Sequence, residues 1–473
     1  MLRVIGERGV GRSINGRQKH FTRMLASLRV GGVLVCGAHT AWAQKPAQTV
    51  DAPTPQVSSG AKPRFLIDRF PDKPSLPVSS SIALEPLGFS SPSAGYLGSR
   101  NAFVSLDFLD ENRLLFTFRV PGLLHRETSG DEDSDERRIR ALVLALPGGR
   151  VEAVTSWTVH DRARYVWMLK DGHFLLRDRN NLMEGDARLA PKPFLDFPGS
   201  LLWLELDPAQ EFLVTNSREP AGPRQKPAAT EEAGQASGPA TPGAKATSDE
   251  ESAAEAEQPN LVVRVLRRQT GEVILVSRAR SAVHLPINSV GYIENLRGRG
   301  TEWMVNLSYF AGGTKMLGRV ESVCEPNDDF VSEEEILVTA CGPTGESRLV
   351  AMTTEGRTLW ISQAPSTEIW PQLTVAGNGS RLAWETLDTA HSVNSYAPLE
   401  GEDVKEQSVT VFDAANGDIA MVAPTSPVLD GGGNVAISPS GRRVALLNNG
   451  AIQLFDLPAP PGLPERAAAR APK

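Results

Sequence analysis

The chain has few of the cysteine and histidine residues on which metal centres and disulfide-stabilised folds depend. It holds three cysteines in 473 residues, and neither Cys324 nor Cys341 has a second Cys or a His at zinc-ligand spacing. Its seven histidines are scattered, and neither His-x-His nor His-Glu-x-x-His occurs. We therefore expect no metal site and no cofactor. The absence of Gly-x-Ser-x-Gly also argues against an α/β-hydrolase domain.

Long apolar runs and helical periodicity are lacking as well. No extended segment repeats apolar residues every 3.6 positions, and 42 Gly and 35 Pro interrupt the chain. The hydrophobic share of 40% is nevertheless sufficient for a core. A fold built mainly from helices is therefore disfavoured.

The N-terminal segment is typical of a secretory signal. A short apolar core, Val30–Ala38, follows a basic flank and ends in Ala41-Trp42-Ala43, a small-x-small cleavage site. The core is too short to span a bilayer comfortably. We predict a signal peptide over 1–43, cleaved after Ala43, with Met24 as an alternative start. Lipidation at Cys36 is a competing interpretation, but Val35 before it is a poor match.

The charge of the expected mature chain limits its partners. Removal of 1–43 leaves 42 Lys and Arg against 55 Asp and Glu, so the formal charge changes from -7 to -13. An acidic surface repels phosphate backbones. We expect a secreted or periplasmic protein with no transmembrane span and no nucleic-acid partner.

Only Cys324 and Cys341 remain after cleavage, and an exported pair favours a disulfide between them. The alternative is two buried thiols. Composition also divides the chain, because 218–259 contains no Val, Ile, Leu, Met, Phe, Tyr or Trp and cannot bury enough apolar area to become ordered. We expect a flexible lead at 44–78, a disordered insert at 218–259 and a disordered tail at 458–473.

A repeated pattern of strand, polar turn and strand runs through the rest. It is clear in Val104–Phe116, Leu202–Val214, Leu373–Trp384 and Asn434–Leu446, and weaker where Val290–Ile293 precedes Trp303–Val305. The second apolar run of each copy begins near Arg113, His173, Glu211, Glu302, Glu335, Arg381 and Arg442. Without the insert the period is about 48 residues, which suits propeller blades of four strands. We predict an all-β fold, a β-propeller of four-stranded antiparallel blades over 79–457. Seven blades is the expected number, and six or eight remain open.

The last copy carries a family resemblance. Ala436–Ala445 followed by Ala451–Leu457 resembles a blade of the divergent bacterial WD40-like propeller superfamily, although the Gly-His and Trp-Asp dipeptides are missing. The resemblance implies a central channel and a ring closed by strands from both chain ends. Ser81–Leu84 would then complete the last blade. Thr354–Trp360 is similar to the tryptophan turn of quinoprotein dehydrogenases, but three other copies lack this Trp, so we expect a packing role.

Three acidic runs are candidate calcium loops: Asp131–Glu136, Asn327–Asp329 and Glu333–Glu335. They lack the glycine and terminal glutamate of a recognised loop, and solvated turns are favoured. The tryptophans in or beside predicted strands favour packing between blades.

No catalytic residue can be named from the sequence. We expect an exported scaffold that binds a protein or a small ligand at one face, as a monomer. The alternative is a propeller enzyme, a hydrolase or lyase, with its site at the channel mouth, and a structural role in the envelope is a third hypothesis. Acidic or His side chains that meet at the channel with shifted ionisation would favour the enzyme.

Overall fold

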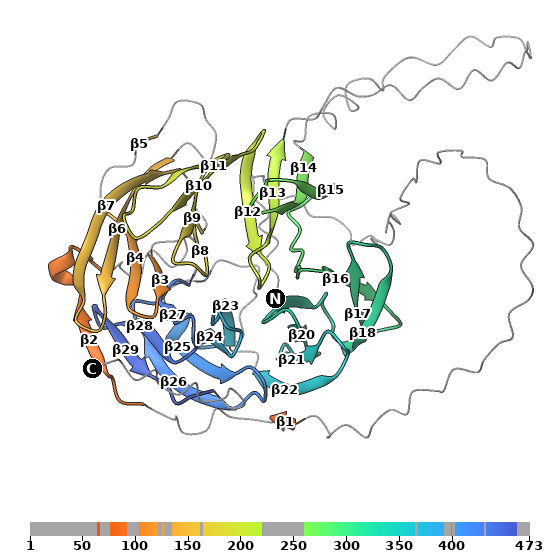
Figure 1. Cartoon of the computed structure of the whole chain (residues 1–473). Coiled ribbons are helices and arrows are strands. Elements are labelled where there is room, and N and C mark those ends of the chain that lie inside the picture. Colours follow the sequence, from red (N-terminus) through yellow and green to blue (C-terminus); the bar gives the residue numbers. More distant parts are fainter. Residues whose placement is uncertain are drawn as a thin grey trace, which may run out of the picture. The chain divides into compact units, whose positions relative to one another are not determined.

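In the computed structural model, the chain forms seven β-sheets that surround one axis as the blades of a propeller (Figure 1). The structure describes residues 64–66, 76–91, 104–120, 125–126, 135–160, 164–219, 260–364, 368–391, 399, 403–429 and 432–460. The expected signal peptide, most of the lead, nearly all of the insert and most of the tail lie outside these residues. The predicted all-β propeller is confirmed, and seven is the number of blades.

The first three blades follow one another along the chain. Blade 1 contains β3 (Val104–Asp110), β4 (Arg113–Arg119), β6 (Asp135–Ala145) and β7 (Arg150–Val159), with the short β5 (His125–Arg126) beside β6. Blade 2 contains β8 (Val166–Met168), β9 (Phe174–Asp178), β10 (Asn181–Gly185) and β11 (Lys192–Asp196). Blade 3 contains β12 (Ser200–Leu206), β13 (Phe212–Glu219), β14 (Asn260–Arg267) and β15 (Val273–Ala279). β13 thus includes the first two residues of the segment expected to be the insert.

The remaining four blades complete the circle. Blade 4 contains β16 (Gly291–Arg297), β17 (Glu302–Tyr309) and β18 (Thr314–Glu321). Blade 5 contains β19 (Asn327–Phe330), β20 (Glu335–Cys341), β21 (Ser347–Thr353) and β22 (Thr358–Ala364). Blade 6 contains β23 (Glu368–Val375), β24 (Arg381–Thr389), β25 (Val404–Asp413) and β26 (Ile419–Thr425). Blade 7 contains β27 (Val435–Ile437), β28 (Arg443–Asn448), β29 (Ala451–Asp456) and β2 (Ser80–Ala83), and the 3-10 turn η1 (Glu85–Leu87) follows β2.

The ring closes where the two ends of the chain meet. β2 pairs antiparallel with β29, with Ile82 opposite Ile452, so an N-terminal strand completes the last blade as expected. Asn449 and Gly450 both adopt positive φ, 50° and 73°, in the tight turn between β28 and β29. A two-residue turn of this kind matches the twist of paired strands and needs residues that tolerate positive φ.

Apolar side chains on the sheet faces pack each blade against the next. Trp360 of blade 5 is fully buried, its indole N–H donates to Ala414 O at 2.6 Å, and its ring stacks on Phe412 of blade 6 with 6.0 Å between centroids. Trp157 of blade 1 likewise contacts Phe174 of blade 2. Each such ring buries a large apolar area between two blades. Trp360 thus has the packing role expected from the sequence.

Blade 4 departs from the regular pattern. A single bridge, Ile287 to Tyr292, connects β16 to the inner segment 283–288 in place of a first strand. Pro286 interrupts this segment, because proline has no N–H to donate to a ladder. The prediction that the second strand of this blade begins near Glu302 is therefore wrong by one strand, since β16 and β17 are the second and third strands.

Blade 5 has an additional strand. β1 (Arg64–Leu66) pairs in parallel with the outer strand β22, with Phe65 opposite Ile361. This short strand belongs to the segment expected to be a flexible lead. Among the described residues no helix is long and apolar enough to cross a membrane.

Candidate functional site

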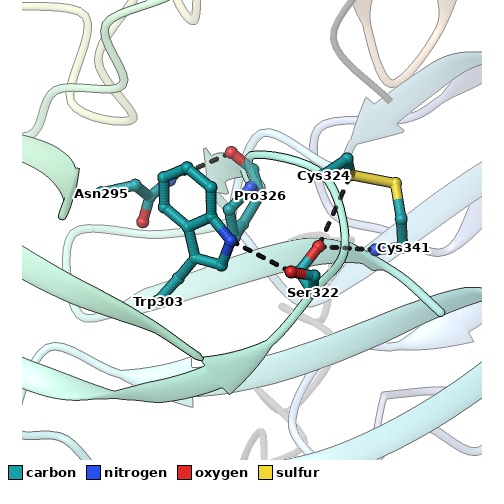
Figure 2. The surroundings of a disulfide bond; sticks show 6 residues. All are labelled: Asn295, Trp303, Ser322, Cys324, Pro326 and Cys341. Atoms are coloured by element: carbon teal, nitrogen blue, oxygen red, sulfur yellow. Dashed lines mark hydrogen bonds between the residues drawn. A yellow bond between two sulfur atoms is a disulfide. The ribbon is translucent and has the colours of Figure 1, made fainter. Parts of the chain in front are cut away.

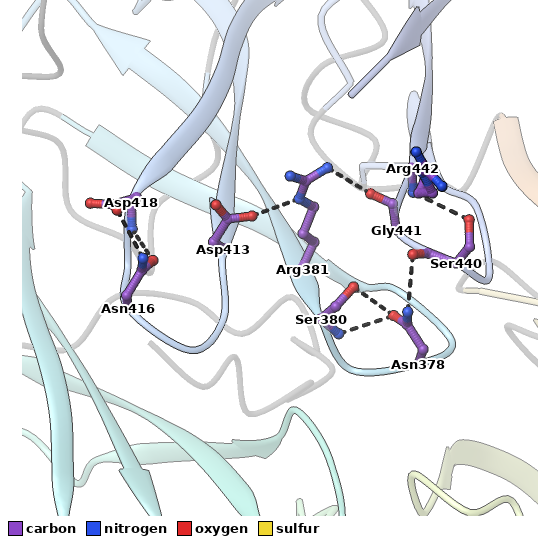
Figure 3. Close-up of polar contacts among 9 residues, drawn as sticks. All are labelled: Asn378, Ser380, Arg381, Asp413, Asn416, Asp418, Ser440, Gly441 and Arg442. Carbon is purple, nitrogen blue, oxygen red and sulfur yellow. Dashed lines mark hydrogen bonds and ion pairs between the residues drawn. The ribbon is translucent and has the colours of Figure 1, made fainter. Parts of the chain in front are cut away.

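The turns that join the first and second strands of the blades, here called A–B turns, contact one another on one face of the ring. Glu111 of blade 1 accepts from Ser440 N at 2.6 Å and from Ser440 Oγ at 2.9 Å in blade 7. Asn378 of blade 6 donates to Ser440 O at 3.0 Å (Figure 3). Lys170 N of blade 2 donates to Gln210 Oε1 of blade 3 at 2.6 Å. These contacts link neighbouring blades on the A–B face.

Glu333 extends this network across three blades. It lies in the A–B turn of blade 5 and accepts from Ala209 N of blade 3 and Ser289 N of blade 4, each at 2.9 Å. The Glu333 carboxylate also affects Asp207 at the end of β12. Burial, reinforced by the charge of Glu333, raises the pKa of Asp207 to about 6. The expected solvated turn at Glu333–Glu335 is thus a junction between blades.

The opposite face, here called the connector face, carries the links between blades and the turns between second and third strands. On this face β13 ends at Glu219 and β14 begins at Asn260 in blade 3, and β24 ends at Thr389 and β25 begins at Val404 in blade 6. Loops that differ most in length usually carry recognition on a repeated scaffold. The connector face is therefore the side on which this ring differs most from blade to blade.

An ionic cluster lies at the axis between blades 3, 4 and 5. His284, on the irregular inner segment of blade 4, forms an ion pair through Nδ1 with Glu205 of β12. Its Nε2 donates to Asp328 O of β19 at 2.6 Å and lies 3.8 Å from Asp329 Oδ1. Blades 3 and 5 are not neighbours in the ring, so one imidazole can contact both only near the axis.

The electrostatics of His284 follow from these contacts. Burial alone would lower its pKa, but the Glu205 carboxylate, the Asp329 carboxylate and the Asp328 carbonyl outweigh burial and raise the pKa to about 10. The ring is therefore an imidazolium at neutral pH with both nitrogens engaged. It acts as a charged brace between blades and has no free nitrogen for proton transfer.

Asp328 lies beside this brace with only 3% of its surface exposed. Its Oδ2 accepts from the Asn295 amide, whereas its Oδ1 is buried without a hydrogen-bond partner among the described residues. Burial raises the pKa of Asp328 to about 7, against the lowering effect of Asn295 and His284. The expected solvated turn at Asn327–Asp329 is wrong, because these residues form the inner strand β19.

A disulfide holds the entry to β19. The sulfur atoms of Cys324 and Cys341, the pair predicted from the sequence, lie at bonding distance, 2.05 Å. Around them Ser322 Oγ accepts from Cys341 N at 2.9 Å, and Asn295 Nδ2 donates to Pro326 O at 3.0 Å (Figure 2). The link fixes the connection from blade 4 to blade 5 and so positions Asp328.

Blade 6 presents a row of carboxylates at its connector-face end. Glu368 of β23 lies directly opposite Asp388 of β24, and Asp388 lies opposite Glu406 of β25, so the three share one face of the sheet. Burial and the charge of Asp388 raise the pKa of Glu368 to about 7. Glu368 Oε2 is buried and has no hydrogen-bond partner in the part of the chain that the structure describes. Like charges directly opposite each other destabilise a sheet.

Three other histidines of the described residues form separate pairs with carboxylates. His160 contacts Asp178 at 2.9 Å, His173 contacts Glu184 at 2.8 Å, and His391 lies 3.5 Å from Asp403. His125 lies in β5. Among the described residues, no group of three or more His, Cys, Asp or Glu could hold a metal ion. Asp131–Ser134 of the first acidic run lie outside the described residues.

Comparison with known proteins shows a resemblance of fold and no family. No protein-family model matches the chain, and no curated protein matches its sequence. A structure of an uncomplexed acylaminoacyl peptidase from Pyrococcus horikoshii is 11% identical with a TM-score of 0.43, covering 77% of this chain and 52% of that chain. The β-propeller domain of the Trilobed protease from Pyrococcus furiosus is 9% identical with a TM-score of 0.42, covering 75% and 96%. This chain therefore spans about half the length of the acylaminoacyl peptidase, and the resemblance is one of fold only.

Proposed function

We propose that the chain is an exported binding module that recognises a basic protein segment or small cationic ligand at the connector face of the ring. The observation that carries the proposal is the row Glu368, Asp388 and Glu406. The row places three carboxylates in register at one end of the sheet, where their combined charge would attract a positively charged ligand. The charge of the chain, with 56 acidic against 49 basic residues, supports a cationic partner.

Export is part of this proposal. It is supported by the signal-like segment at 1–43 and by the bonded pair of Cys324 and Cys341, since disulfides persist in oxidising compartments. Fractionation with an antibody against the ring tests it. Recovery of the chain in the cytoplasmic fraction, with both cysteines open to alkylation, would contradict it.

Binding is tested with two variants of the ring, each of which changes the charge on one face only. Glu406 is exposed at the connector face, and Asp171 is exposed in the A–B turn of blade 2 on the other face. We expect an oligolysine peptide to bind the wild-type ring, with an affinity that falls as salt rises. Glu406→Lys should weaken this binding at least several-fold, and the matched Asp171→Lys should leave it unchanged. Equal effects of the two substitutions, or no binding of the peptide, would refute the assignment.

An enzyme is the second candidate, and one observation favours it. Glu205, His284, Asp328 and Asp329 meet at the axis, and the pKa values of the last three are shifted, which is typical of catalytic sites. Asp328, with its pKa raised to about 7, would be the acid–base group of such a hydrolase or lyase. The engaged nitrogens of His284 favour binding over catalysis. If the wild-type chain converts a substrate and a correctly folded Asp328→Asn variant does not, the enzyme replaces the binding module as the favoured function.

A further inference from the structure

The outer strand of blade 1 differs from the outer strands of the other blades. β7 has ten residues, and within the described part of the chain it pairs only with β6, so its outer edge has no strand beside it. An unpaired edge presents a row of backbone N–H and C=O groups to a second chain. A long edge of this kind is therefore able to accept another strand.

The other outer strands carry features that hinder such pairing. β22 is covered by β1. β11 contains Pro193 and β26 contains Pro424, which cannot donate to an added strand. β2 has only four residues. β15 and β18 have seven and eight residues and include charged side chains within the strand. These are the devices by which natural sheets avoid edge-to-edge association.

β7 has none of these features over most of its length. Ala153–Val159 contains no charged residue, no proline and no glycine, and is rich in β-branched residues. Val154 near its centre is 61% exposed, whereas Trp157 and Val159 pack into the core toward blade 2. The exposed face of this segment is therefore uncharged, carries an apolar side chain in the open, and has no partner within the described structure.

We propose that β7 pairs antiparallel with β7 of a second copy of this chain, across a two-fold axis perpendicular to the sheet at Val154. This axis places Val154 opposite Val154 of the second copy, Glu152 opposite Ser156, and Arg150 opposite Thr158. No two like charges are then directly opposed, and Arg150 and Glu152, which form an ion pair at 2.8 Å, stay together at each end. The charge pattern of the strand fits its own copy, which is why a second copy is the occupant. The proposal departs from the monomer expected from the sequence.

The proposal that a second copy pairs with β7 is tested by sedimentation of the full mature chain over a concentration series. We expect the apparent mass to rise two-fold between low and high micromolar concentration. Val154→Lys should keep the mass of one copy throughout, because a lysine at the centre of an edge opposes pairing. The matched control is Val276→Lys on the outer strand β15, where the side chain is 60% exposed, and it should dimerise as wild type does.

The register is tested by Val154→Cys, which places two thiols on the two-fold axis. Mild oxidation should give a covalent dimer, whereas Val276→Cys should give none. A wild-type mass of one copy at every concentration overturns the proposal. Loss of the dimer in both lysine variants assigns the contact to another surface, and a covalent dimer from Val276→Cys alone does the same. Unchanged circular dichroism of the variants keeps each outcome interpretable.

Discussion

One buried arginine contributes to the contact between blades 6 and 7. Arg381 at the start of β24 is fully buried. Its Nε donates to Asp413 Oδ1 at 2.7 Å, and its Nη1 donates to Gly441 O of blade 7 at 2.8 Å (Figure 3). The Asp413 side chain is 12% exposed. The guanidinium therefore has a charged partner that is also shielded from water.

Asp413→Ala leaves this guanidinium buried without that counter-charge. Removal of one partner from a buried ion pair typically costs about 3–5 kcal/mol, because the remaining charge keeps its desolvation penalty. The matched control is Asp456→Ala, which breaks the Arg443 Nε to Asp456 Oδ1 contact of 2.9 Å between side chains that are 28% and 56% exposed. A pair so open to water contributes about 0–1 kcal/mol.

The assay is urea unfolding at pH 7, followed by tryptophan fluorescence. We expect Asp413→Ala to lower the unfolding free energy by about 3–5 kcal/mol, and Asp456→Ala by less than about 1 kcal/mol. The double variant Arg381→Met with Asp413→Leu should recover most of the loss, because it removes both charges. Similar losses in the two alanine variants would refute the reasoning, and so would a double variant no more stable than Asp413→Ala.

Three further predictions concern single contacts. Burial raises the pKa of Glu385 from 4.5 to about 8. The neutral carboxyl therefore contributes its full stability below about pH 4.5, and this contribution is lost as the pH rises to 8. Glu385→Gln should raise the urea midpoint at pH 8 and leave it nearly unchanged at pH 4.5. Ile82→Ala in β2 should cost about 2–5 kcal/mol and accelerate amide exchange in β29, as measured by mass spectrometry. Cys324→Ser with Cys341→Ser should cost about 3 kcal/mol, and reductant should lower the midpoint of wild type only.

The ring is predictable from the sequence because its signals are local. Polar turns between short apolar runs mark the hairpins, so six of the seven anchor positions fall at or one residue before the second strand of a blade. The seventh, Glu302, falls on a third strand, because segment 283–288 contains Pro286, which has no backbone N–H, and forms a single bridge in place of a first strand. The pairing of β2 with β29 was also predictable, since the last copy stopped after three strands.

The site was less predictable, because its contacts join residues that are far apart in sequence. Asn327–Asp329 has the composition of a turn, yet its carboxylates lie on an inner strand and Asp328 is buried. His284 stands alone in sequence, and the packing of blade 4 against blade 3 brings it to Glu205. The one available signal was the pair of acidic runs at and after β19, which together with a lone His on an adjacent unit would have indicated a charged inner strand.

The position of His284 explains how blade 4 tolerates its irregular inner segment. Pro286 removes a backbone donor there, and a single bridge is the ladder contact that connects the segment to β16. The imidazolium adds charged contacts to blades 3 and 5 from the same segment. Through this one side chain, blades 3 and 5 are linked although blade 4 separates them. The ion pair and hydrogen bonds of His284 thus add to the contacts that Asn216 and Glu333 make with this segment, from blades 3 and 5, and they partly offset the missing first strand of blade 4.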